Sequence, residues 1–515
     1  MKISVVQKQI QALPADALIV NLFEGATMPA GTTGAVDSAL GATDGIPGDG
    51  MVSRLIKLGD FKGKLNEVAV LYTNGMIPAP RVILVGLGNK DQLTADRVRQ
   101  VSGASMRKAR DLGCKRVASV VHGSGLGGLD VRIAAKATVE GALLGAYQFR
   151  EYKTSPGNGK HIDEFTLVEF NPARMQAVRN GAHDGEIIAN STNSARTLIN
   201  RAPNHLTPAA FADVAREMSI ASGLTVAILE EDGIAQFKMG GLLAVSQGSA
   251  NRPRFVILDS APESKTAPLV FIGKGVTFDT GGISLKDPSG MESMKADMGG
   301  AAAVFGALQA IGQLRLPQRV IGLLPLVENM PSDLAFRPGD VITMMSGMTV
   351  EIISTDAEGR MILADALHYA KRFEPRAVVD LATLTGACVV ALGDGMAAGV
   401  FSNDDAFAAQ LMKCAHNCGE RLWQLPLYPE YGDKIKSDVA DLKNSAGRTS
   451  GVGTSAYFLK RFVETEHGRD AFPWAHIDMA PMMFNTDNKG YQPRGAMGYG
   501  ARTLVELARA SGLGV

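Results

Sequence analysis

The sequence predicts an α/β protein with two domains, and three observations lead to this prediction. The chain has 515 residues, more than one hydrophobic core usually organises. Hydrophobic residues make up 46% of it and charged residues 20%, so it can bury a sizeable core. Short apolar runs typical of strands alternate with longer stretches of helical periodicity, and no internal repeat is present.

Residues 1 to 170 form the predicted N-terminal α/β domain. Its strands are expected where short apolar runs rich in Val, Ile and Leu occur, and its helices where apolar residues recur every three to four positions. The predicted strands are 16–23, 67–73, 81–88 and 165–170, and the predicted helices are 94–112 and 131–147.

A long helical stretch at 173–200 is expected to connect the two domains, and residues 171 to 190 are assigned to a helical linker. From 191 to 515 the alternation of strands and helices resumes as a larger C-terminal domain. Its predicted strands are 254–259, 269–274, 319–327, 377–384 and one before Thr355, and its predicted helices are 296–314 and one after Arg360.

Composition excludes several classes of protein. The 52 basic and 52 acidic side chains cancel, so net charge gives no reason to expect DNA or an anionic membrane as the main partner. No stretch approaches the ~18 consecutive apolar residues of a membrane span, and the N-terminus has no uninterrupted signal-peptide core. Four scattered cysteines fit a reducing compartment. We therefore expect a cytoplasmic protein without a membrane association.

Two local patterns receive an ordinary structural interpretation. Cys414 and Cys418, with His416 between them, have no matching second half for a zinc site. The Gly-rich stretch GSGLGGLD at 123–130 follows a strand-like run, as a dinucleotide-binding loop would. No acidic residue closes a strand ~20 residues further on, so we interpret it as a turn rather than a phosphate site.

The stretch STDAEGR at 354–360 places Asp356 and Glu358 two residues apart. In an extended segment these two side chains point to the same side, where their charges raise each other's pKa unless a cation or a shared proton intervenes. An acidic cap for the helix that follows is the alternative. This stretch alone leaves both interpretations open.

A second stretch, residues 271 to 303, adds three charged side chains. Lys274 ends a predicted strand, Asp279 precedes a flexible Thr-Gly-Gly turn, and Asp297 begins a helix rich in Gly and Ala. Each alone has an ordinary interpretation as a strand end, a turn or a helix terminus. Together with Asp356 and Glu358 they provide four carboxylates, which two divalent cations would balance in charge, and one amine. None of the eight histidines lies in these stretches, and oxygen ligands of this kind suit Mn²⁺, Mg²⁺ or Zn²⁺.

These motifs resemble those of the M17-type leucyl aminopeptidases, the bacterial cytosol aminopeptidases. STDAEGR is similar to the signature of that family, and GKGVTFDTGGISLK followed by MKADMGGAA is similar to its metal-binding block. Further similar stretches appear in order between residues 190 and 515. The resemblance implies a smaller N-terminal α/β domain of macro-like fold and an α/β/α catalytic domain with a mixed, mostly parallel central sheet.

The resemblance also implies a metal-dependent aminopeptidase that releases Leu or other apolar residues from the N-terminus of peptides by attack of a metal-bridging water or hydroxide. One ion would be held by Lys274, Asp279, Asp297 and Glu358. The other would be held by Asp279, Asp356 and Glu358. The two ions are expected to be Mn²⁺ or Zn²⁺, with Mg²⁺ as a third choice, and the α-amine of the substrate would coordinate one of them.

Lys286 and Arg360 match the family's catalytic pair. The resemblance implies that Lys286 stabilises the developing oxyanion and that Arg360 holds a bicarbonate ion as proton shuttle, a task for which a planar guanidinium is suited. It also implies a homohexamer. The positions that match the substrate site are Met294, Thr383, Leu384, Gly386, Ala480 and Met483.

The sequence departs from the family pattern at Ser354, which replaces Asn, and at Pro481, which replaces Gly. Pro481 removes a backbone donor beside the expected pocket. A two-metal phosphoesterase and an additional DNA-binding or regulatory role are the alternatives. The first usually has histidines or a phosphate cradle, which these stretches lack, and neutral net charge leaves the second open.

Overall fold

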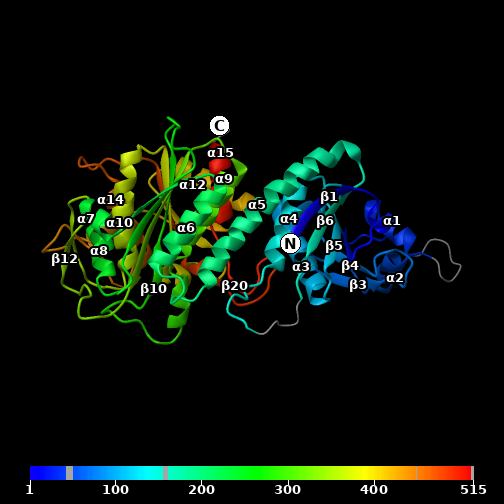
Figure 1. The fold of residues 1–515 in the computed structure, drawn as a ribbon, viewed down its shortest axis with the longest axis horizontal. Coiled ribbons are helices and arrows are strands. Elements are labelled where there is room, and N and C mark those ends of the chain that lie inside the picture. The colour runs from blue at the N-terminus through cyan, green and yellow to red at the C-terminus, as the bar shows by residue number, and fades with distance from the viewer. Residues whose placement is uncertain (42–49, 155–159, 448, 512–515) are drawn as a thin grey trace. The chain divides into compact units, whose positions relative to one another are not determined.

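The computed structural model describes residues 1–41, 50–154, 160–447 and 449–511 (Figure 1). They form two compact units, and each is an α/β structure, so the predicted two-domain α/β fold is confirmed. The first unit comprises Met1–Asn190 and Thr486–Arg494, and the second comprises Ser191–Asn485 and Gly495–Val515. The segment from Thr486 to Arg494 thus belongs to the first unit although it lies near the end of the chain.

The first unit contains a six-stranded sheet in the order β1-β6-β5-β2-β4-β3. All neighbouring strands are parallel except β3 and β4. The strands are β1 (Lys2–Gln7), β2 (Ala17–Leu22), β3 (Val68–Tyr72), β4 (Arg81–Gly86), β5 (Arg116–Val120) and β6 (Glu164–Glu169). The helices are α1 (Gly31–Ala39), α2 (Met51–Leu58), α3 (Ala95–Asp111), α4 (Val131–Ala146) and the first part of α5 (Met175–Asn200), whose residues from Ser191 on belong to the second unit.

The second unit is built on a nine-stranded sheet in the order β16-β15-β18-β14-β9-β11-β8-β7, with β10 paired to the end of β11. The central neighbours β18, β14, β9 and β11 run parallel, and the pairs β15–β18, β11–β8 and β8–β7 are antiparallel. The sheet is therefore mixed and mostly parallel, as expected. Its strands are β7 (Thr225–Leu229), β8 (Arg254–Asp259), β9 (Leu269–Gly273), β10 (Gly275–Asp279), β11 (Val320–Asn329), β14 (Ala377–Ala382), β15 (Ala398–Ser402), β16 (Leu422–Gln424) and β18 (Trp474–Asp478).

Helices cover both faces of this sheet (Figure 1). Helix α9 packs on β9 and β14 and contacts α6 and α15, whereas α10 contacts β9 and β11 together with α8 and α14. The helices are α6 (Pro208–Ser222), α7 (Glu231–Gln236), α8 (Gly240–Ser246), α9 (Gly299–Leu314), α10 (Glu358–Ala370), α11 (Gly386–Leu392), α12 (Asp405–Cys418), α13 (Glu430–Lys434), α14 (Gly451–Val463) and α15 (Ala501–Ser511). Small sheets are formed by β12 (Val341–Thr343), β13 (Thr349–Glu351) and β17 (Leu442–Lys443), and by β19 (Phe484–Asn485) and β20 (Gly495–Ala496).

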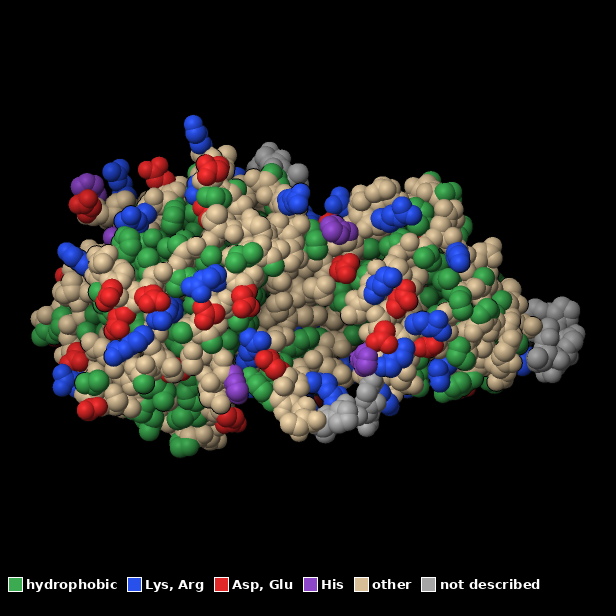
Figure 2. All heavy atoms as spheres, in the orientation of Figure 1, with side chains coloured by type: hydrophobic (Ala, Val, Ile, Leu, Met, Phe, Trp, Pro, Cys, Tyr) green, Lys and Arg blue, Asp and Glu red, His purple; other side chains and the backbone are tan. Residues whose placement is uncertain are grey.

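Surface charge and hydropathy agree with the composition. On the face drawn in Figure 2, basic and acidic side chains are interspersed over both units. No helix in the described part of the chain is both long and apolar enough to span a membrane. Cys414 and Cys418 are both buried on α12.

The parallel strands bring the chemically interesting residues to one edge of the sheet. Lys274 directly follows β9, Asp279 ends β10, and Thr383 directly follows β14. Open α/β sheets place their ligands at the carboxyl ends of such strands. The small-residue helix α9 lies close behind this edge, because a Cβ on Gly300 would approach the carbonyl oxygen of Leu381 to 2.0 Å.

We predict that Gly300→Ala lowers the stability of the second unit, whereas Gly299→Ala does not. A Cβ at 300 collides with backbone, and such overpacking costs about 1–3 kcal/mol. A Cβ at 299 would have its nearest neighbours at 3.5 Å, an ordinary contact. Thermal unfolding of the two variants is the measurement, and equal melting temperatures would contradict the close contact between α9 and β14.

Candidate active site

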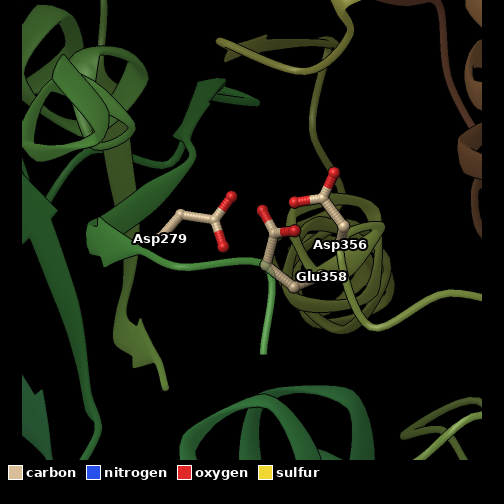
Figure 3. A group of neighbouring side chains, drawn as sticks. All are labelled: Asp279, Asp356 and Glu358. Carbon is tan, nitrogen blue, oxygen red and sulfur yellow. The ribbon is translucent and has the colours of Figure 1, made fainter. Parts of the chain in front are cut away.

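Three carboxylates converge at the carboxyl edge of the second sheet. Figure 3 shows Asp279 at the end of β10 facing Asp356 and Glu358 at the start of α10. One oxygen from each lies within 4.8 Å of the others. Asp279 and Glu358 are buried, and Asp356 is exposed at the rim.

Lys274 connects this group to Asp297. Its Nζ lies 2.8 Å from Asp297 Oδ1 and 2.7 Å from Glu358 Oε1, and it donates to the Thr383 carbonyl at 3.2 Å. The other oxygen of Asp297, Oδ2, is buried and has no partner among the described residues. A buried carboxylate oxygen without a donor is costly unless a ligand satisfies it.

Lys286 lies on the other side of the group. Its Nζ is 2.9 Å from Asp279 Oδ2 and also contacts Asp356 Oδ1. The structure thus brings together all five predicted metal ligands and Lys286. When all six groups are ionised, four negative charges face two positive ones.

The protein environment perturbs the titration of these groups. Burial raises the pKa of Asp279 to about 6, and burial also raises the pKa values of Asp297 and Asp356. Burial opposes the charge of Glu358 as well, but Lys274 and Lys286 hold its pKa down to about 2.

For the two lysines, the neighbouring carboxylates outweigh the effect of burial on the pKa. Burial disfavours the charge of Lys274 and Lys286, yet the surrounding carboxylates raise the pKa of each above its usual range. The cluster therefore attracts cations strongly, because two lysines neutralise only half of its negative charge.

The donor set fits divalent metal ions. Carboxylate oxygens are the ligands that Mn²⁺, Mg²⁺ and Zn²⁺ accept in proteins, and one amine nitrogen adds a borderline donor. Added cations would satisfy the unpartnered Asp297 Oδ2 and balance the two excess negative charges. Among the described residues, the three facing carboxylates form the one cluster of metal-ligating side chains.

Arg360 lies in the first turn of α10, two residues after Glu358. It is 8% exposed, its Nη1 donates to the Asn444 carbonyl at 2.7 Å, and its buried Nε has no partner in the described structure. Burial lowers its pKa to about 10, which leaves it cationic at neutral pH. The Nε–H of its guanidinium group thus has no acceptor among the described residues and could donate to an anion.

Sequence reasoning missed the residues that position these groups. The Asn329 side-chain amide donates to Asp279 Oδ1 at 2.9 Å and to the Thr355 carbonyl at 3.0 Å, so it joins the end of β10 to the loop before α10. Asn444 holds the second loop, because its side chain accepts from the Ile353 amide at 2.8 Å and donates to the Ser354 carbonyl at 2.7 Å. Asn329 could have been noticed as a polar residue ending an apolar strand.

The two departures from the family pattern have local explanations. Ser354 Oγ accepts from the backbone amide of Asp356 at 3.3 Å. A serine hydroxyl can thus stabilise the same kind of local turn as the side chain of the asparagine that it replaces. Pro481 lies in the first turn of the short 3₁₀-helix Ala480–Met482, where a backbone N–H has no helical acceptor. Neither change removes a contact to the carboxylate group.

The predicted substrate residues lie on the segments that follow β14 and β18 and on the short 3₁₀-helix before α9. Thr383 Oγ1 donates to Asp297 Oδ1 at 2.7 Å, so this residue is tied to the metal-binding group. The amides of Leu384 and Ala480 both donate to Asp478 Oδ1 at 3.2 Å, so Asp478 ties the segment after β14 to the segment after β18. The remaining three are Met294, half-buried before α9, Gly386, exposed at the start of α11, and Met483, half-buried after residue 482.

Comparison with known proteins identifies the class of site. Residues 193–505 match the sequence profile described as the cytosol aminopeptidase family, catalytic domain, and residues 20–156 match the N-terminal domain of the same family. A probable cytosol aminopeptidase of Geobacter sulfurreducens is 44% identical over 514 residues, which cover 99% of this chain and 100% of the relative. One of Alkaliphilus oremlandii is 40% identical over 512 residues, 99% of each chain.

Two solved structures are also similar to nearly the whole chain. A mutant of tomato leucine aminopeptidase superposes with a TM-score of 0.85 at 30% identity, covering 99% of this chain and 96% of the other. The bottromycin maturation enzyme BotP in complex with Mn superposes with a TM-score of 0.83 at 35% identity, covering 97% and 100%.

We predict that Asn329→Ala weakens metal binding without unfolding the protein. Without the amide, Asp279 loses a donor that orients it, and loss of such an outer hydrogen bond typically costs 10- to 100-fold in metal affinity, on the order of 1–3 kcal/mol. Titration of Mn²⁺ into the stripped protein measures the effect. Asn251→Ala is the matched control, since Asn251 donates to Glu328 rather than to the cluster, and equal affinities for the two variants would refute the positioning role.

Proposed function

The chain belongs to the cytosol aminopeptidase family and is a metal-dependent aminopeptidase, and we propose that Lys274 and the four carboxylates hold two divalent cations at its active site. The observation that carries the proposal is the convergence of Asp279, Asp356 and Glu358 within 4.8 Å, beside an unpartnered buried oxygen of Asp297. In this assignment Asp279 and Glu358 serve both ions. Lys274, Asp297 and Asp356 each serve one. The proposed ions are Mn²⁺ or Zn²⁺, with Mg²⁺ as a third choice.

Such ions, when bound, supply Lewis-acid activation of water and of the peptide carbonyl. Lys274 would bind through its neutral amine, so the ammonium group that now contacts Asp297 and Glu358 would release one of its protons to solvent. The carboxylates would then lose their ammonium partner and gain the metal instead. Thr383 and Asn329 would keep Asp297 and Asp279 oriented throughout.

Lys286 is proposed to stabilise the negative charge that develops on the carbonyl oxygen during attack. Its side chain is 24% exposed, so its ammonium reaches the open side of the cluster, and its raised pKa keeps it charged. Arg360 is proposed to hold a bicarbonate ion through guanidinium donors that the protein leaves free, so that the anion can move a proton between water and the leaving amine.

Peptide substrates are proposed to bind with their free α-amine at the metal centre, which limits cleavage to the first peptide bond. Met294, Thr383, Ala480 and Met483 would contact the first side chain, and this apolar set favours Leu or Met. The Leu384 carbonyl and the Gly386 backbone would bind the substrate main chain.

A homohexamer is also proposed, on the resemblance to the family. A cytoplasmic location is proposed because the relatives are named as probable cytosol aminopeptidases. The two alternatives gain no support. The family match favours neither a phosphoesterase nor a DNA-binding role, and the face in Figure 2 shows no continuous basic band.

We predict that chelation abolishes hydrolysis of leucine p-nitroanilide and that Mn²⁺, Zn²⁺ or Mg²⁺ restores it. Glu358→Gln removes the ligand proposed to serve both ions, so kcat/KM should fall at least about 100-fold, in line with the loss of a metal ligand. Glu351→Gln is the control, because Glu351 accepts from Ser437 outside the cluster. Full activity of the chelated protein, or of Glu358→Gln, would show that the metal assignment is wrong.

We also predict that Nα-acetylleucine p-nitroanilide is not hydrolysed. Acetylation removes the basic amine that is proposed to coordinate a metal, while it leaves the side chain and the scissile bond unchanged. Parallel assays of the free and acetylated substrates measure the difference. Comparable kcat/KM values would rule out recognition of the α-amine.

A further inference from the structure

The first unit contains a cavity of about 660 Å³ at the carboxyl ends of its parallel strands. It is lined by Leu22 at the end of β2, Val120 at the end of β5 and Glu169 at the end of β6. The chain leaves β2 toward β3 and β4 on one side and leaves β5 toward β6 on the other. Ligands of open α/β sheets bind where neighbouring strands diverge in this way, and the volume is that of a small-molecule site.

The Gly-rich loop after β5 forms one wall of this cavity. Among the described residues, the amides of residues 123 to 127 donate to no protein acceptor, whereas the next two, of Gly128 and Leu129, donate back to Gly125 and Gly123. Gly123 has a φ of +82°, in the left-handed region that favours glycine. A run of amides without protein acceptors around such a turn binds anions such as phosphate.

Charged side chains extend the anion site. Lys8 and Arg174 line the cavity, and neither forms an ion pair within the described part of the chain. One carboxylate, Glu169, also lines it and accepts from the Asn171 amide at 2.9 Å. The described lining of the cavity therefore carries two cationic side chains and a set of backbone amides but only one carboxylate, a balance that favours an anionic ligand.

Asn21, at the cavity wall, presents a hydrogen-bond acceptor. Ser119 Oγ donates to the Val120 carbonyl at 2.9 Å, so at 3.2 Å from His122 Nε2 it acts as the acceptor. His122 Nδ1 is then unprotonated and accepts from the Asn21 side-chain amide at 2.7 Å. Burial lowers the pKa of His122 to about 4, in agreement with a neutral ring. The side-chain oxygen of Asn21, Oδ1, is left to accept from a hydroxyl or amino group of a ligand.

Three exposed apolar side chains also line the cavity. Met28 is 70% exposed, Leu126 is 64% exposed and Phe170 is 63% exposed. Exposed apolar groups gathered at one opening commonly mark a binding site, and Phe170 offers a face on which an aromatic ring can stack.

We propose that this cavity binds a nucleoside diphosphate. Its phosphates would lie against the amides of residues 123 to 127 and the cations Lys8 and Arg174. The ribose hydroxyls would donate to Glu169 and Asn21, and the base would pack on Phe170. The cavity belongs to the first unit, and none of the proposed metal ligands lines it.

The test is calorimetric titration of the full chain with ADP, pyrophosphate and adenosine. A Cβ on Gly125 would meet no protein atom within 4 Å, so Gly125→Asp places a carboxylate beside the phosphate wall without disturbing the fold. ADP should bind saturably, at least about tenfold more tightly than pyrophosphate or adenosine. Gly125→Asp should weaken ADP binding at least about tenfold and Gly125→Ala less than about threefold, with aminopeptidase activity unchanged in both.

Three results would overturn the proposal: no saturable ADP binding, unchanged ADP binding in Gly125→Asp, or pyrophosphate binding as tight as ADP binding. Phe170→Ala is the second variant and carries the test if Gly125→Asp does not fold. It should weaken ADP binding and leave pyrophosphate binding unchanged, because Phe170 is proposed to contact the base. Equal effects on both ligands would likewise exclude a nucleotide.

Discussion

Four carboxylates gathered in a mostly buried site repel one another, and the active-site structure is organised around this repulsion. Burial alone raises the pKa of Asp279, Asp297 and Asp356, so the fold would favour their neutral forms without neighbouring cations. Lys274 and Lys286 supply half of the required positive charge. Metal ions would supply the other half, because they would bring charge without a side chain and would satisfy the unpartnered Asp297 oxygen.

The surrounding backbone brings the charged groups close enough for this chemistry. A Cβ on Gly359 would lie 2.4 Å from Lys274 Cε, so a larger residue there would displace the end of the lysine side chain from its place beside α10. Gly281 has a φ of +86° and allows the turn after Asp279 to fold against the second loop. Thr355 Oγ1 then donates to the Gly281 carbonyl at 2.5 Å and fastens the two loops to each other. Hydrogen bonds and close packing between neighbouring loops thus hold the carboxylates that repel.

Much of this arrangement was predictable from the sequence. The strands ending near Lys274 and Thr383 were recognisable as apolar runs, and parallel strands in one sheet bring their carboxyl ends to one edge. The positioning roles of Asn329 and Asn444 were not, since both residues act through contacts with loops distant in sequence. Only Asn329 stands out locally, as a polar residue that ends an apolar strand. That residues 486–494 belong to the first unit was also not predictable, because this too depends on contacts between segments distant in sequence. The loop at 123–127 was interpreted as a turn, and the Gly128 amide does donate to the Gly125 carbonyl as in a turn. The cavity beside this loop is visible only in three dimensions.

The central claim is that Lys274 and the four carboxylates hold two divalent ions. A crystal structure of the Mn²⁺-loaded protein, with anomalous scattering recorded at the manganese edge, tests it most directly. We expect two peaks, one bonded to Lys274 Nζ and Asp297 and one bonded to Asp356, with Asp279 and Glu358 contacting both. A single peak, or Lys274 still paired with Asp297 and Glu358 in the loaded protein, would contradict this account of the site.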